Sequence, residues 1–278
     1  MPATAALLDQ DRTDDLQAAV RAALAGGEPL AIRGGGSKAF YGRAEMGRPL
    51  EVGGHSGIVH YEPTELVVTA RAGTPLAALE AHLAEHGQCL GFEPPRFGEA
   101  ATVGGAVAAG LSGPARPWLG AVRDAVLGVR VLTSTGEVLR FGGEVMKNVA
   151  GYDLARLMAG ALGTLGILLD VSLKVAPRPA AEVTRVLDLG PGEALARLAE
   201  WGRRPLPITG AAHGDGRLRL RLAGNEAAVA EAGERLGGAV PADGAGFWAE
   251  LREQRLDFFA GETPLWRLSV PPAAPLPE

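Results

Sequence analysis

The chain has 278 residues, 47% of them apolar and 21% charged, a length that suits one large domain or two. Its formal net charge of −5 argues against a nucleic-acid-binding protein that neutralises phosphates, and its single cysteine, Cys89, excludes an internal disulfide framework. Glycine is the outlying residue type, with 40 positions, or about 14% of the chain against an average near 7%. Because glycine inside a helix or strand is destabilising, we expect most of the excess in loops or where the backbone closely approaches another group.

The first half of the chain is predicted to combine helices with short strands. Gly26 and Gly27 end the first helix, and Thr74 is a good N-cap that precedes Pro75 at the first position of a second helix. The predicted elements are a helix over 11–25, strands over 30–32, 58–61 and 66–70, a helix over 75–86, a hairpin of strands 129–134 and 137–141, a helix over 151–159 and a strand over 167–175.

Pro177 and Pro179 mark the best domain boundary, since proline continues neither a helix nor a central strand. We therefore expect a first domain over residues 1–177, a second over 180–270 and a proline-rich tail over 271–278. In the second domain the order β-α-β-β-α-β suggests a small α+β, ferredoxin-like fold. Its predicted elements are strands over 183–189, 208–212, 218–222 and 265–270, helices over 193–201, 226–236 and 247–256, and a turn at Asp215-Gly216.

A first glycine segment, Arg33–Lys38, directly follows the strand over 30–32. Successive backbone N–H groups in a glycine-rich turn can bind a phosphate without any side chain, although a plain loop between two strands explains the pattern equally well. Gly34–Ala39 also matches the dinucleotide fingerprint G-x-G-x-x-A, but that fingerprint must open a helix, and the glycines and proline over 40–49 do not allow one. The P-loop pattern fails as well, because the lysine follows the serine.

A second glycine segment, Ala101–Gly110, is built almost entirely of Gly, Ala and Val, so a large flat ligand could lie almost against its backbone. Thr102 is a good N-cap, and a helix that begins here would offer free N–H groups to an anion. The alternative, which needs no ligand, is a helix of small residues packed on a sheet. A third glycine segment, Gly163–Ile167, leads into the apolar strand over 167–175 and on its own is an ordinary turn.

The three glycine segments, together with Lys147–Leu154, resemble in order and spacing the FAD-binding domain of the vanillyl-alcohol oxidase and p-cresol methylhydroxylase (PCMH) superfamily. Within that superfamily, Arg116–Asp124 and Leu265–Ser269 resemble the E subunits of bacterial glycolate oxidases. The resemblance is strongest over residues 30–175. It implies an α+β chain in which a two-subdomain, PCMH-type FAD-binding domain precedes the small second domain.

The resemblance also implies a binding mode for the cofactor. The first glycine segment would wrap the diphosphate of FAD, and the second would pass beside the diphosphate and the flavin. Many members of the superfamily tether the flavin through a histidine in or near the first segment, but positions 37 and 38 are serine and lysine here, so we expect non-covalent FAD. Catalytic residues stay unassigned. The expected cofactor-binding residues are Arg33, Gly34, Gly35, Gly36, Ser37, Lys38, Thr102, Val103, Gly104, Gly105, Gly110, Gly166 and Ile167.

Two histidine patterns suggest metal sites but have simpler explanations. His82 and His86 match H-x-x-E-H of inverted zinc proteases, yet a histidine at the end of a helix also interacts favourably with the negative helix terminus. His213–Gly216 resembles part of a metal-binding motif of larger flavin-linked 2-hydroxyacid dehydrogenases, but Arg217 replaces its asparagine and no second histidine follows. Asp-Gly between two strands is itself a hairpin turn signal. We therefore expect no metal site.

The resemblance implies the FAD-binding subunit of a multi-subunit glycolate oxidase. Such a subunit would oxidise glycolate, a small 2-hydroxy acid, to glyoxylate or relay its electrons through FAD. One cysteine cannot hold an iron–sulfur centre, so such a centre would have to come from a partner. The resemblance implies a catalytic flavoprotein subunit and an iron–sulfur subunit as the partners. Arg116, Arg123 and Lys147 are candidate cations for the substrate, each equally explained as a structural charge. Two alternatives stay open: a non-catalytic structural subunit, and a stand-alone FAD-linked oxidase of another small alcohol or acid.

No sequence feature predicts direct insertion into a membrane. Met1–Gln10 contain no basic region and already include Asp9, so we expect no signal peptide. The longest uncharged stretch, residues 100–115, is short for a membrane span and is interrupted by glycines and a proline. We expect a cytoplasmic protein, and attachment to the inner membrane through partner subunits stays open.

Overall fold

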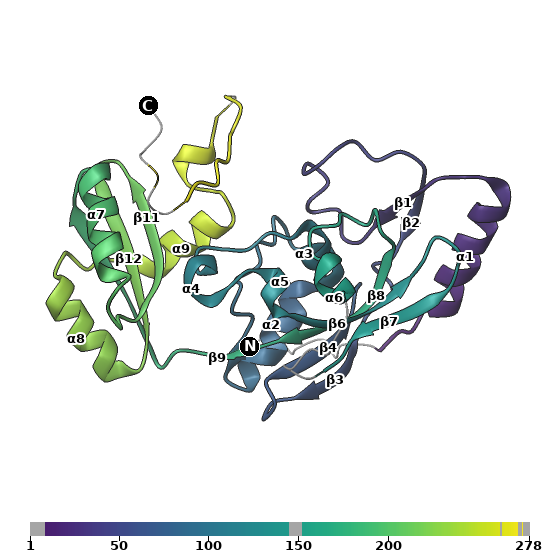
Figure 1. Cartoon of the computed structure of the whole chain (residues 1–278), viewed down its shortest axis with the longest axis horizontal. Coiled ribbons are helices and arrows are strands. Elements are labelled where there is room, and N and C mark those ends of the chain that lie inside the picture. Colours follow the sequence, from purple (N-terminus) through teal and green to yellow (C-terminus); the bar gives the residue numbers. More distant parts are fainter. Residues whose placement is uncertain (1–8, 145–151, 262, 272–273, 275–278) are drawn as a thin grey trace. The chain divides into compact units, whose positions relative to one another are not determined.

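The chain is divided into two compact units, which are described separately (Figure 1). The computed structural model describes residues 9–144, 152–261, 263–271 and 274. Unit 1 comprises residues 1–112 and 120–178, and unit 2 comprises residues 113–119 and 179–278. From Pro179 onward the whole chain belongs to unit 2, and the earlier short segment over 113–119 belongs to unit 2 as well. The expected first domain over 1–177 did not allow for this segment.

Unit 1 is built around an antiparallel sheet whose strand order is β3-β4-β8-β6-β7. Its central strand β8 is buried along its length up to Leu173, because both faces of the sheet are covered, and a near-continuous apolar run is typical of such a strand. The predicted hairpin is confirmed as β6 and β7. The strands are β3 (Ile58–Glu62), β4 (Val67–Arg71), β6 (Val126–Leu132), β7 (Val138–Gly142) and β8 (Ile167–Lys174).

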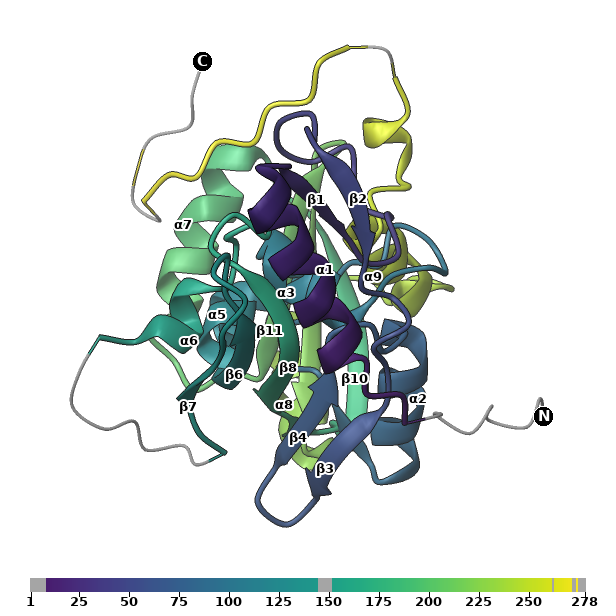
Figure 2. The same ribbon diagram turned by 90° about the vertical axis from the view of Figure 1, so that its right-hand side faces the viewer.

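Helices and two strand pairs complete the described part of unit 1. Figure 2 shows α1 across the unit, with the parallel pair β1 and β2 beside its C-terminal end. Leu16 and Val20 bury one face of α1 in the core, and Gly27 ends the helix at a φ of 66°. The elements are α1 (Thr13–Gly26), β1 (Leu30–Arg33), β2 (Arg48–Glu51), α2 (Leu76–Glu85), β5 (Gln88–Cys89), α3 (Val103–Ala109), α5 (Val122–Ala125), α6 (Leu154–Leu157) and β9 (Ala176–Pro177).

The start of α2 differs from the sequence prediction. Thr74 does not cap the helix, because its hydroxyl donates to the carbonyl of Gly57 and accepts from the N–H of the same residue, each at 3.0 Å. Pro75 is the N-cap, with an extended ψ of 127°. The buried threonine therefore joins two loops. The helix predicted over 151–159 is also shorter, since α6 covers Leu154–Leu157, and Gly151 lies outside the described residues.

A cluster of charged residues joins the chain before α1 to the sheet. Partial burial works against the charged form of the Asp11 carboxyl group. Hydrogen bonds from Thr13 and the charges of Arg71 and Arg130 outweigh this effect and hold the pKa of that carboxyl well below its ordinary value. The ion pairs are Arg71–Asp11 at 2.9 Å, Arg71–Asp9 at 2.7 Å and Arg130–Asp170 at 2.6 Å.

Unit 2 has an antiparallel sheet in the order β10-β12-β11. Alternation along β12 decides which helices cover each face: Leu218, Leu220 and Leu222 are fully buried in a core with α7 and α8. Arg219 and Arg221 point to the other face, where they lie over the rings of Phe247 and Trp248 of α9. The elements are α4 (Arg116–Leu119), β10 (Ala181–Asp188), α7 (Pro191–Trp201), β11 (Ile208–Gly214), β12 (Arg217–Gly224), α8 (Glu226–Leu236), α9 (Gly244–Arg252) and η1 (Asp257–Phe259).

The last predicted strand is wrong. Residues 265–270 pair with no strand in the described part of the chain, and Trp266 is 83% exposed. At the outer edge of β10, Val186 instead forms a single bridge with Ala239. A strand needs a partner edge, so the apolar alternation over 265–270 does not form one here. The α+β class is confirmed, but the fourth strand of a ferredoxin-like sheet is missing from the described residues. Most of the predicted tail over 271–278 lies outside them.

No helix in the described ranges combines the length and the apolar character that crossing a membrane requires.

Candidate functional site

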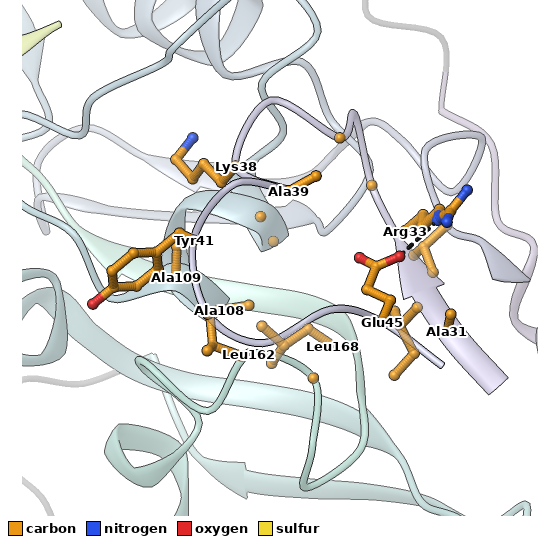
Figure 3. Close-up of a pocket in the computed structure, with 18 of the residues that line it drawn as sticks. Ala31, Arg33, Lys38, Ala39, Tyr41, Glu45, Ala108, Ala109, Leu162 and Leu168 are labelled. Carbon is orange, nitrogen blue, oxygen red and sulfur yellow. Dashed lines mark hydrogen bonds and ion pairs between the residues drawn. The ribbon is translucent and has the colours of Figure 1, made fainter. Parts of the chain in front are cut away.

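Unit 1 contains a cavity of about 850 Å³ that all three glycine segments line (Figure 3). We call it the glycine-lined cavity. Small-molecule sites have volumes of about 300–1,000 Å³. The walls come from the loop after β1, from α3 and from the loop before β8, three pieces that lie far apart in the sequence. The fold therefore brings together three motifs that are weak when each is taken alone.

The first glycine segment packs directly on the second. A Cβ atom on Gly35 would lie 1.4 Å from the carbonyl oxygen of Ala100, and one on Gly34 would lie 2.6 Å from Oγ1 of Thr102. Gly36 differs, because a Cβ atom there would meet nothing within 4 Å, but its φ of 70° is left-handed. Protein packing explains two of the three glycines, and backbone conformation explains the third.

The backbone of the first glycine segment is suited to an anion. Within the described part of the chain, the N–H groups of Gly35, Gly36 and Ser37 donate to no other residue. All three residues line the glycine-lined cavity. Successive N–H groups around a left-handed glycine form a concavity that binds phosphate oxygens. This observation favours the phosphate-binding interpretation over a plain loop.

The second glycine segment forms α3, but its N-terminal N–H groups are not free. Each donates to an acceptor within unit 1, so the expectation that the start of this helix offers N–H groups to an anion is wrong. Helix α3 lines the cavity with glycine and alanine residues, whose side chains are small or absent: Gly104, Gly105, Ala108 and Ala109. The bonds join Val103 N to Thr74 O (2.9 Å), Gly104 N to Ala72 O (2.7 Å) and Gly105 N to Thr102 Oγ1 (3.1 Å).

The third glycine segment is held against α3. Gly160 N donates to Val107 O at 3.0 Å, and Leu162 N donates to Ala108 O at 2.9 Å. Gly163 and Gly166 have left-handed φ angles of 76° and 143° and line the cavity. The loop thus forms a wall of the cavity next to α3, a place that its local pattern does not indicate but that the resemblance implied for Gly166.

Ten of the thirteen expected cofactor-binding residues line the cavity, and three do not. Val103 is buried in the core, Gly110 ends α3 against Gly160, and Ile167 pairs with Leu132 in the sheet. Sequence reasoning missed several apolar wall residues, which carried no motif signal. The ten are Arg33, Gly34, Gly35, Gly36, Ser37, Lys38, Thr102, Gly104, Gly105 and Gly166, and the missed ones include Ala31, Val52, Ala72, Ala108, Ala109, Met158, Leu162 and Leu168.

Four charged residues line the described part of the cavity: Arg33, Lys38, Arg43 and Glu45. The Nε of Arg33 donates to Oε2 of Glu45 at 2.8 Å, and this hydrogen bond raises the pKa of the guanidinium. Lys38 donates to the carbonyl of Arg96 at 3.2 Å and lies over the ring of Phe97. The cavity wall therefore carries an excess of positive charge, which suits an anionic ligand.

The histidine patterns lie outside the cavity. The ring centroids of His82 and His86 are 5.0 Å apart, and both rings contact the ring of Tyr61. The Nε2 atom of His213 lies 2.8 Å from the carbonyl oxygen of Leu189. The positive φ angles of Asp215 and Gly216 confirm the hairpin turn. Over the described ranges, no group of three or more His, Cys, Asp or Glu residues is arranged to hold a metal ion.

Neither of the two candidate substrate cations that the structure describes, Arg116 and Arg123, lines the cavity. Arg116 belongs to unit 2, and Arg123 donates to the carbonyl of Ala159 at 3.5 Å. Lys147 lies outside the described residues, together with the rest of residues 147–151 of the Lys147–Leu154 motif. Asp153 caps α6 by accepting from Arg156 N at 3.0 Å. These contacts give Arg123 and Asp153 structural roles.

Comparison with known proteins agrees with this geometry. The family model described as an FAD binding domain matches residues 5–142. Glycolate oxidase subunit GlcE of Escherichia coli (strain K12) is 52% identical over 97% of this chain and 77% of its own length. Glycolate oxidase subunit GlcD of Bacillus subtilis (strain 168) is 31% identical over 56% of this chain, but the match spans only 33% of that protein. D-lactate dehydrogenase of Anaerostipes hadrus is 36% identical over 47% of this chain and 27% of its own length.

Solved structures support the fold. An alkyldihydroxyacetonephosphate synthase aligns with 88% of this chain and 54% of its own chain, with a TM-score of 0.67 and 18% sequence identity. At that identity the likeness concerns the fold alone. The chain belongs to the PCMH-type FAD-binding superfamily of oxidoreductases, in the group of the glycolate oxidase E subunits.

Proposed function

We propose that the chain is the FAD-binding subunit of a multi-subunit glycolate oxidase and holds FAD non-covalently in the glycine-lined cavity. The observation that carries the proposal is the convergence of the three glycine segments on one cavity of suitable volume. The relationship to the glycolate oxidase subunit of E. coli supports the choice of complex.

The residues of the cavity fit the chemical parts of FAD. The unpaired N–H groups of Gly35, Gly36 and Ser37 would receive the diphosphate, and the small residues of α3 would leave room for a flat ring. When bound, FAD supplies the hydride-accepting chemistry, and the protein supplies binding and orientation. Arg33 and Lys38 would add positive charge beside the phosphates.

Non-covalent binding is supported by the wall composition. Among the described residues that line the cavity, none is histidine or cysteine. The five histidines of the chain lie at positions 55, 60, 82, 86 and 213, and His55 is fully buried beside Asp170 on the sheet. The wall thus offers no histidine to tether the flavin.

The substrate-oxidising role depends on partner subunits in this proposal. Oxidation of a 2-hydroxy acid needs a base within reach of the hydroxyl proton. The carboxylate among the described lining residues, Glu45, lies beside Arg33, which this proposal assigns to the diphosphate of FAD and not to the flavin ring. This favours a relay in which the FAD of this chain passes electrons between a catalytic flavoprotein subunit and an iron–sulfur subunit. The non-catalytic subunit and the stand-alone oxidase are the competing functions that the following experiments separate.

The first experiment is an absorbance spectrum of the purified full chain after incubation with FAD and gel filtration. We expect flavin bands near one FAD per chain, and a yellow supernatant after precipitation with trichloroacetic acid. A chain that retains no FAD would support the structural-subunit alternative, whereas a yellow pellet would show covalent attachment.

The second experiment adds glycolate under anaerobic conditions to the FAD-loaded chain, with and without the other subunits. The proposal expects the flavin of this chain to lose its visible absorbance when the other subunits are present and to keep it when the chain is alone. Bleaching of the isolated chain by glycolate would instead assign substrate oxidation to this chain.

A further inference from the structure

An ion pair between Arg33 and Glu45 lies in the wall of the glycine-lined cavity. Glu45 and Arg33 both line the cavity, and Figure 3 shows the Glu45 carboxylate directed at the Arg33 guanidinium. The atoms Nε and Oε2 are 2.8 Å apart, and the two side chains are 46% and 38% exposed. The ion pair therefore stands in the cavity wall and is accessible to a ligand.

The pair joins two ends of one loop. Arg33 is the last residue of β1, and its carbonyl is fixed by the N–H of Val52 at 2.7 Å. Glu45 lies in the segment over 34–47, which contains no helix or strand. The cation is thus held by the β1–β2 pair, while the anion is carried by a loop outside any helix or strand.

We propose that Glu45 is an internal competitor for the diphosphate of the cofactor, and that it weakens the binding of ligands that carry this group. The inference rests on the proposed binding of FAD. A diphosphate that approaches Arg33 finds the guanidinium neutralised by Glu45, and it is repelled by the carboxylate if the carboxylate stays. Binding of the diphosphate therefore displaces Glu45 from Arg33. A flavin without phosphates leaves the ion pair in place, so Glu45 does not weaken its binding.

The competition has a modest expected size, because an exposed ion pair is weak. Repulsion of a neighbouring diphosphate adds to the loss of the Arg33 contact, so we expect Glu45→Gln to tighten FAD binding about two- to tenfold. The substitution keeps the size of the side chain and removes its charge. ADP, which carries the diphosphate without the flavin, should gain by a similar factor.

Glu51→Gln is the matched control. Glu51 faces Arg33 across the β1–β2 pair but does not line the cavity. It contributes to the raised pKa of Arg33 through its charge, after the contributions of Glu45. Removing Glu51 therefore changes the net charge near Arg33 without opening the cavity wall, and it should change FAD affinity by less than twofold, within the range of an exposed charge.

The experiment titrates the full chain with FAD by quenching of flavin fluorescence, and with ADP and riboflavin by calorimetry. We expect Glu45→Gln to tighten FAD and ADP, to leave riboflavin unchanged, and to exceed the effect of Glu51→Gln. In an Arg33→Gln background, the gain in FAD affinity from Glu45→Gln should fall to the gain from Glu51→Gln. Without Arg33, the Glu45 carboxylate is no longer held in the cavity wall.

Three results would overturn the inference: equal effects of Glu45→Gln and Glu51→Gln, an equal gain for riboflavin, or a gain that persists without Arg33. These outcomes differ from failure of the proposed function itself. If the unmodified chain binds neither FAD nor ADP, the proposed function fails. If it binds FAD and the variants behave alike, the competitor role fails and the cofactor site stands.

Discussion

Gly104 lies so close to Ala72 that a Cβ atom added to the glycine would come within 2.5 Å of the Ala72 Cβ and 2.9 Å of its carbonyl oxygen. The N–H of Gly104 donates to that same carbonyl at 2.7 Å. Helix α3 therefore contacts the chain next to β4 backbone to backbone. The glycine is required by packing within unit 1, although it also lines the cavity.

We expect Gly104→Ala to lower the free energy of unfolding by about 1–3 kcal/mol in the absence of FAD, because the added methyl group forces α3 away from the sheet. Chemical denaturation followed by circular dichroism measures the loss. Gly143→Ala is the control, since a Cβ atom there would meet nothing within 4 Å. Equal stability of the two variants would show that α3 can shift without cost.

Ala108 offers a cleaner test of the cavity. Its side chain lines the cavity from α3 and is half-buried, so Ala108→Leu fills ligand space with little change in the protein core. We expect FAD affinity to fall about tenfold or more, while stability without FAD stays within about 0.5 kcal/mol. Ala81→Leu places the same side chain on an exposed position of α2, outside the cavity. Unchanged FAD affinity in Ala108→Leu would exclude the cavity as the flavin site.

The charged cluster before α1 predicts acid sensitivity. The pKa of the Asp11 carboxyl is lower in the folded chain than in the unfolded chain, so its stabilisation is fully present above the unfolded value, near 3.9. That stabilisation is lost as the pH falls from about 5 towards the folded value. The melting temperature of the chain should drop over this range.

Asp11→Asn should remove about 1 kcal/mol of stability at pH 7 and should flatten the drop in melting temperature below pH 5. Glu231→Gln, at an exposed position of α8, is the control and should keep the pH profile of the unmodified chain. An Asp11→Asn profile parallel to the unmodified one would rule out this carboxyl as a source of the acid sensitivity.

The hairpin of unit 2 provides a prediction that separates the two units. Gly216 has a left-handed φ of 70°, so Gly216→Ala should destabilise unit 2 by about 1–2 kcal/mol. FAD affinity should not change, because the glycine-lined cavity is formed by unit 1. Gly214→Ala, where a Cβ atom would meet nothing within 4 Å, is the control in the same hairpin. Loss of FAD binding in Gly216→Ala would mean that the cofactor site depends on unit 2.

Local signals predicted several elements well. Helix α8 begins and ends as expected, at Glu226 and Leu236, because Asn225 caps its start through two backbone N–H groups and Gly237 follows its end. The hairpin of β6 and β7 was equally clear. The strand β2 (Arg48–Glu51) was missed, since four residues with a proline carry no periodicity and form a strand only beside β1.

The candidate site was predictable in part. The motifs identified its glycine segments, but tertiary contacts decide what each glycine does. The N–H groups at the start of α3 find acceptors in Ala72 and Thr74, which no local pattern reveals. The apolar walls at Met158 and Leu168 join the cavity only through the fold. Glu45 is a further case, since nothing in the sequence indicates that an acidic residue twelve positions after Arg33 returns to bond with it.

The segment over 113–119 has a consequence for synthesis on the ribosome. It leaves the exit tunnel before most of unit 2 has been made, yet its helix α4 packs against β11 of that unit. Unit 1 in turn needs β6 and β8, which follow the segment in the chain. During translation, residues 113–119 are therefore made before their packing partner β11 exists. Until β11 has been made, the apolar side chains of Trp118 and Leu119 lack the strand against which α4 packs in the folded unit.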